Sequence, residues 1–211
     1  DVCSSDLHCC ADVSWRIRHV AADVFPELYA IAKKNSVTGL GELPSWFAEL
    51  LQDRETEVRV VAGARLVELA KLAPVPDVVS TLVPVIGQLV KDSSHYVRAA
   101  IATSVMKLSP VLGSEDTVVH LRPFFLELLK DEIPDVRLNV IADLDEVSAV
   151  TGIEVLSQSL LPAIFKLAED KNWRIRQAVI RSVPRIGEEL GVEYFDDKLS
   201  ALCMTWLSDP V

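Results

Sequence analysis

The residues best suited to hold a metal ion lie at the start of the chain. They are Cys3, His8, Cys9 and Cys10, which carry the thiol and imidazole groups that zinc prefers. Cys9 and Cys10 are adjacent, however, and no Cys-x-x-Cys pair accompanies them as a structural zinc site would require. We therefore expect no metal and no cofactor, and assign these residues to a helix end or to a frayed terminus.

The other groups that could perform catalysis are scattered. The four histidines lie in four separate parts of the sequence: His8, His19, His95 and His120. Asp196 and Asp197 are adjacent, so on a helix their carboxylates point apart. The sequence has no glycine-rich phosphate loop, no His-Glu-x-x-His and no Gly-x-Ser-x-Gly. We therefore predict that the chain is not an enzyme.

A different set of charged residues recurs at a fixed interval. An aspartate opens each interval: Asp12, Asp53, Asp92, Asp131, Asp170 and Asp209, spaced by 41 and then by 39 residues. An arginine follows each of the first five by six positions: Arg18, Arg59, Arg98, Arg137 and Arg176. Such an aspartate can accept hydrogen bonds from the free amides at a helix start, and the arginine can pair with a carboxylate of its own or the adjacent unit. We predict a structural ladder of ion pairs.

Two helices in each interval must position this ladder. Around Asp92, apolar residues recur at helical spacing on both sides. They are Leu82, Val85, Ile86 and Leu89 before it, and Val97, Ile101, Val105 and Leu108 after it. We expect the loops between units at 35–41, 74–77, 113–116, 151–152 and at Gly191.

Prolines recur with the same period. Pro44, Pro84, Pro123 and Pro162 fall in the first helix of successive units, while Pro26 and Pro184 fall in second helices. A proline inside a helix removes one backbone donor, so we expect each of these helices to bend.

Composition narrows the class of protein. The chain has 211 residues, 50% of them hydrophobic, which excludes a disordered chain at a net charge of −10. The acidic balance argues against nucleic-acid binding. The longest uncharged run has 13 residues, too few to cross a membrane. Four cysteines and no Asn-x-Ser/Thr site favour an intracellular location, cytoplasmic or nuclear.

The two-helix unit of about 39 residues with Asp-x-x-x-x-Val-Arg resembles the HEAT repeat. This resemblance implies an all-α, right-handed solenoid of about five HEAT repeats built from antiparallel helix pairs. The expected units are 1–40, 41–79, 80–118, 119–157 and 158–194, followed by a first helix at 195–207. We infer a piece of a longer array, since polar capping units are absent from both ends.

Four segments resemble a narrower family, the scaffold (A, regulatory) subunits of protein phosphatase 2A. They are 14–18 with 22–28, 131–141, 156–170 with 172–176, and 191–207. The resemblance is only generic over 53–90. It implies a horseshoe of fifteen repeats whose C-terminal part holds the catalytic Ser/Thr phosphatase subunit and whose N-terminal half holds a regulatory B-type subunit. This chain would correspond to about the seventh to eleventh repeats and the first helix of the twelfth.

The resemblance also implies where partners bind, on the turns within repeats. Asn172, Trp173 and Arg174 would contact the catalytic subunit, and Trp15 and Arg16 the regulatory subunit. A large aromatic side chain beside an exposed arginine is typical of an interface anchor, whereas the alternative is a tryptophan folded over a neighbouring helix end. The family has a lysine where this chain has Asn172.

Other assignments remain open at this stage. Tyr96 is a weaker interface candidate, while Trp46 and Trp206 are expected to pack in the core. The alternative function is another HEAT-repeat adaptor, such as part of a transport receptor, and acidic inner surfaces could equally bind a basic peptide.

Overall fold

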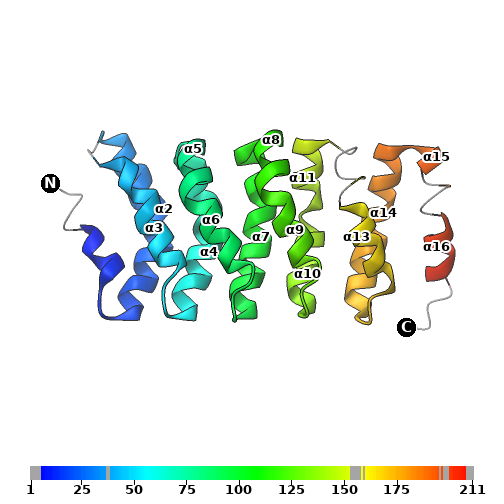
Figure 1. The fold of residues 1–211 in the computed structure, drawn as a ribbon, viewed down its shortest axis with the longest axis horizontal. Helices are drawn as coiled ribbons and strands as arrows, with labels where there is room; N and C mark the ends of the chain where they lie inside the picture. Colours follow the sequence, from blue (N-terminus) through cyan, green and yellow to red (C-terminus); the bar gives the residue numbers. More distant parts are fainter. Residues whose placement is uncertain are drawn as a thin grey trace.

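A computed structural model describes residues 6–36, 39–152, 158, 160–194, 196 and 200–207. Within these ranges the chain is helical and has no β-strand. The helices stack side by side into one elongated array with the two termini at opposite ends (Figure 1). The expected α-solenoid is therefore confirmed.

The second helix of each unit forms one layer of the array, behind the first helices in Figure 1. These second helices are α2 (Trp15–Lys34), α4 (Thr56–Leu72), α7 (His95–Leu112), α10 (Pro134–Ala142) continued by α11 (Leu144–Thr151), and α14 (Trp173–Leu190). Each packs against the second helix of the next unit, α2 on α4, α4 on α7, α7 on α10 and α10 on α14.

The first helices form the other layer. They are η1 (Asp6–Ala11), then η2 (Leu40–Glu42) with α3 (Leu43–Leu51), α5 (Val75–Asp77) with η3 (Val78–Leu82) and α6 (Val83–Leu89), α8 (Ser114–Asp116) with η4 (Thr117–Leu121) and α9 (Arg122–Leu128), α13 (Leu161–Lys166) with η5 (Leu167–Glu169), and α15 (Val192–Tyr194) and α16 (Ser200–Trp206). The ladder position Asp209 lies outside the described residues.

A continuous apolar core lies between the layers. The residue just before each ladder arginine is fully buried from the second unit on: Val58, Val97, Val136 and Ile175. Phe25 of α2 packs on Phe47 of α3 with ring centroids 5.2 Å apart. Trp46 and Trp206 are half-buried against the same core, as expected. Burial at a fixed repeat position is what makes the stack regular.

The first-helix prolines do not stop their helices. Pro84 and Pro123 each stand in the first turn of an α-helix that directly continues a five-residue π-helical segment, η3 and η4. The proline ring would clash with the carbonyl four residues earlier, and the wider π turn relieves this clash. At Pro84 and Pro123 the helix type therefore changes locally, while the bend expected at the four prolines stays a prediction.

The second helices differ from expectation in two ways. Both α2 and α14 run without interruption through Pro26 and Pro184, so their expected bends stay a prediction; α7 contains a further proline, Pro110, that the prediction missed. The one second helix that breaks, at Asp143 between α10 and α11, has no proline at the break.

The loops between units are shorter than predicted. The segments 74–77 and 113–116 were expected to be loops, but α5 and α8 begin there at Val75 and Ser114. A single residue reverses the chain before α8, because Gly113 has φ +84° and ψ 177°, a conformation open almost only to glycine.

Candidate protein-binding ridge

Each ladder aspartate holds the turn that precedes a second helix. Its carboxylate accepts the backbone N–H of the residue two positions on, at 2.7 Å for Asp12, 2.9 Å for Asp53 and 2.8 Å for Asp92. Asp131 and Asp170 do the same at 2.9 and 2.8 Å. The amide belongs to the residue just before the helix and not to its first turn, so the aspartate fixes the turn and the helix start follows from it.

Each ladder arginine joins two units. Its Nε and Nη2 pair with the aspartate of the next unit: Arg18 with Asp53 at 2.5 and 2.8 Å, Arg59 with Asp92 at 2.8 and 3.0 Å, and Arg98 with Asp131 at 2.6 and 3.1 Å. Its Nη1 donates to the carbonyl of its own unit's aspartate, at 2.8 Å in all three. The predicted ladder therefore runs between adjacent units, and the planar fork of each of these three arginines is shared by two turns.

The fourth step of the ladder is looser. Arg137 reaches Asp170 through Nη2 alone, at 3.0 and 2.9 Å, and its buried Nε has no partner in the structure. Arg176 donates to its own unit's Asp170 carbonyl at 2.9 Å, and Asp209, the carboxylate expected for it, lies outside the described residues.

The ladder shifts the titration of its members. Burial alone would raise the pKa of Asp53, but hydrogen bonds from Arg18 and from the Glu55 amide outweigh it, so this pKa lies below its ordinary value. The same balance lowers the pKa of Asp131, through Arg98 and the Ile133 amide. Both carboxylates are therefore charged at neutral pH.

The turns fixed by the ladder carry the predicted interface residues. Trp15 and Trp173 are the first residues of α2 and α14, so they lie on the same edge of the array at different units. Trp173 is 50% exposed, whereas Trp15 is less exposed and packs against the core. Trp173 therefore has the exposure that an interface anchor needs, whereas the packing of Trp15 is that of a tryptophan folded over its neighbours; the partner-binding role of both stays a prediction.

An arginine covers each of these rings. The Arg16 Cζ lies 4.8 Å from the centroid of Trp15, and the Arg174 Cζ lies 5.7 Å from that of Trp173. His19 also meets Trp15 edge-on, with centroids 6.3 Å apart. Such cation–π contacts keep a large ring in place at the surface at little entropic cost on binding.

Asn172 has a structural role that the resemblance did not imply. It is the N-cap of α14, and its Oδ1 accepts the Arg174 amide at 2.9 Å. Asparagine at this position is among the best helix caps, and a lysine cannot accept this bond. Tyr96, the remaining turn aromatic, is 65% exposed and stacks at 4.0 Å on His95.

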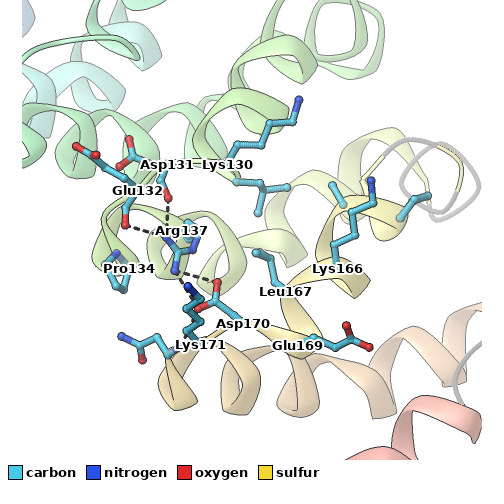
Figure 2. Close-up of a pocket in the computed structure, with 14 residues that line it drawn as sticks. Lys130, Asp131, Glu132, Pro134, Arg137, Lys166, Leu167, Glu169, Asp170 and Lys171 are labelled. Atoms are coloured by element: carbon cyan, nitrogen blue, oxygen red, sulfur yellow. Dashed lines mark hydrogen bonds and ion pairs between the residues drawn. The ribbon is translucent and has the colours of Figure 1, made fainter.

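A groove opens beside Trp173 on the same edge. It has a volume of about 790 Å³ and lies between the turn of α9–α10 and that of α13–α14. Figure 2 shows the Arg137–Asp170 pair in it, with Lys130 and Lys166 projecting from the two units that form it. Sequence reasoning did not find this groove, because its two walls lie in different units.

The cysteines offer little metal chemistry in the described part of the chain. Burial, and then the neighbouring Cys9, raise the pKa of Cys10 to about 12, so it is a neutral thiol at pH 7. No group of three or more potential metal ligands comes together among the described residues, and Cys3 lies outside them. None of the described helices is both long and apolar enough for a bilayer.

Two family models match this chain. A model described as PPP2R1A-like HEAT repeat matches residues 39–113, and a model of HEAT repeats matches residues 122–210. The chain folds as a solenoid of HEAT repeats. The first match includes residues 53–90, where the resemblance to the phosphatase scaffold is only generic.

Solved structures share the fold. A designed armadillo repeat protein in complex with the peptide (KR)4 matches with a TM-score of 0.62 at 15% identity, over 85% of this chain and 80% of its own. An engineered protein matches with a TM-score of 0.59 at 12% identity, over 94% and 90%. A comparison with curated proteins found no match. At these identities the likeness concerns the fold alone.

Proposed function

We propose that this chain is a non-catalytic scaffold of the protein phosphatase 2A type. Its ridge of intra-repeat turns holds the catalytic phosphatase subunit around Trp173 and a regulatory B-type subunit around Trp15. The observation that supports this most is the half-exposed Trp173, covered by Arg174 and set on a turn that Asp170 closes by accepting the Asn172 amide. An exposed aromatic side chain beside a groove is the arrangement expected of a binding hot spot.

The family match supports the same proposal from another part of the chain. The PPP2R1A-like model covers the second and third units, which carry neither tryptophan of the ridge. The scaffold would act by raising the effective concentration of the two bound subunits for each other. Any phosphatase chemistry would then belong to the bound partner.

The two tryptophans provide a crossed test. Affinities of the chain for a purified catalytic subunit and for a purified B-type subunit are measured by biolayer interferometry, with Trp173→Ala and Trp15→Ala as variants. Trp173→Ala should weaken catalytic-subunit binding by about 2 kcal/mol, roughly thirtyfold, and leave B-subunit binding unchanged. Trp15→Ala should do the reverse, with a smaller loss because its ring is already half-buried.

The alternative, an adaptor for basic peptides, has one supporting observation. A solved repeat protein of similar fold is described in complex with (KR)4. Measuring the affinity of the chain for a (Lys-Arg)4 peptide under the same conditions distinguishes the phosphatase scaffold from the basic-peptide adaptor. Peptide binding that survives both tryptophan variants, together with no binding of either phosphatase subunit, would favour the adaptor.

A further inference from the structure

A groove of about 510 Å³ on the second-helix layer has a lining rich in arginine. It lies between α10–α11 and α14. Its apolar side includes Leu138, Ile141 and Ala178, and three arginines of α14 line it: Arg174, Arg181 and Arg185. Asp145 is the one acidic side chain among the lining residues, and it pairs with Arg185.

The repeat itself shows that stacking does not require these arginines. The positions equivalent to Arg181 in the other units hold Asp23, Ala64, Thr103 and Ala142, which are separated by the repeat spacing. Those equivalent to Arg185 hold Glu27, Glu68, Lys107 and Glu146. The side chains at these two positions are therefore mostly acidic or neutral in the other units, and only the fifth unit has an arginine at both.

The three arginines differ in their partners. All are exposed, but Arg185 is already paired with Asp145. Arg181 has no hydrogen-bond or ion-pair partner among the described residues. A positive surface in a chain of net charge −10 will attract acidic groups over a short range, since the rest of the molecule repels them.

We infer that this groove binds an acidic, extended segment of a partner protein. Carboxylates of the segment would pair with Arg174 and Arg181, whose forked guanidinium groups suit such anions, and apolar side chains between them would lie on Leu138 and Ile141. Eleven residues of helix separate Arg174 from Arg185, which is about 16 Å, or about five residues of extended chain.

The groove adjoins the surface of the phosphatase proposal, because Trp173 and Arg174 also line it, but the inference is tested at a residue outside that surface. Arg181 lies two helical turns beyond the ridge, so a variant there tests the groove without altering Trp173. Binding of the catalytic subunit should be unchanged in Arg181→Glu. The failure of one proposal is thereby distinguished from the failure of the other.

The experiment uses a fluorescein-labelled peptide of three Glu-Leu repeats and fluorescence anisotropy with the whole chain. The peptide should bind, and should bind more weakly as salt rises. Arg181→Glu should weaken it about tenfold, because an attractive contact becomes repulsive, and Arg181→Ala should weaken it less. Arg122→Glu is the matched control, because it makes the same charge change at an exposed position of the first-helix layer and should bind like the parent. Circular dichroism and thermal midpoints confirm that each variant is folded.

Three outcomes would overturn the inference. The first is no binding of the Glu-Leu peptide to the parent chain at millimolar concentration. The second is an equal loss in Arg122→Glu and Arg181→Glu, which would show that net charge alone is responsible. The third is equally tight binding of a ten-nucleotide oligothymidine, which would show a site for polyanions and not for an acidic peptide.

Discussion

Replacing Arg98 by methionine removes the centre of the ion-pair ladder while keeping much of the apolar stem. The guanidinium group makes two bonds to Asp131, at 2.6 and 3.1 Å, and one to the Asp92 carbonyl at 2.8 Å. The side chains of Arg98 and Asp131 are only 11% and 7% exposed, so solvent compensates little for the loss. Asp131 would keep one bond, from the Ile133 amide.

We expect this change to destabilise the array by about 3 kcal/mol, the lower end of the range for breaking one half of a buried pair. Urea unfolding followed by circular dichroism measures the total loss in the free energy of unfolding. Hydrogen exchange shows where in the array this loss falls, since a repeat array can open at one junction. The largest rise in exchange should fall where α7 meets α10.

Arg54→Ala is the control. Arg54 and Glu55 are 71% and 41% exposed and 3.8 Å apart, so their pairing should contribute less than about 0.5 kcal/mol. A loss below about 1 kcal/mol in Arg98→Met, or a loss no larger than that in Arg54→Ala, would refute the view that the ladder joins the units.

Two further predictions concern stability. The pKa values of Asp53 and Asp131 are lower in the folded chain than in the unfolded one, so the unfolded state takes up protons first as pH falls. The contribution of the ladder to the free energy of unfolding should therefore be full above about pH 5 and should fall as pH decreases through about 4. Urea titrations at a series of pH values measure this. Stability that is flat between pH 6 and 3 would contradict this. Gly113→Ala should lower the free energy of unfolding by about 1–3 kcal/mol, because φ +84° with ψ 177° strains any other residue. Gly41→Ala is the control, since Gly41 has no positive φ. Equal losses in the two variants would argue against backbone strain.

The ladder could be predicted from sequence because its chemistry is local and periodic. Asp92 and Arg98 stand at the same offset in every unit, so a regular stack brings each arginine to the next aspartate. The same period placed Val97 and its equivalents in the core. What the period could not give was the direction of the pairing, which runs to the next unit and not within one.

Features that depend on three-dimensional contact were missed. The π segments before Pro84 and Pro123 arise from relief of a steric clash that leaves no mark in the hydrophobic pattern. The break at Asp143 contains no proline or glycine from which it could be predicted, and the structure gives no physical reason for it. Both grooves have walls from two units, so neither follows from one repeat read alone.

The ridge was predicted in part. The resemblance placed Trp15 and Trp173 on turns, and the structure puts both at the start of a second helix. Their exposure differs because Trp15 packs on the core while Trp173 does not. The capping bond from Asn172 was missed, although an asparagine directly before a helical pattern is itself a signal for it.

The most direct test of the scaffold is simultaneous binding of two partners. A B-type subunit is immobilised, and the catalytic subunit retained on it is measured by its phosphatase activity as the concentration of this chain is raised. A scaffold predicts that retained activity rises from the background, passes through a maximum and falls as excess chain occupies each partner separately. It also predicts that Trp173→Ala lowers the maximum. Retention that does not depend on the chain, or no retention at any concentration, would contradict the account.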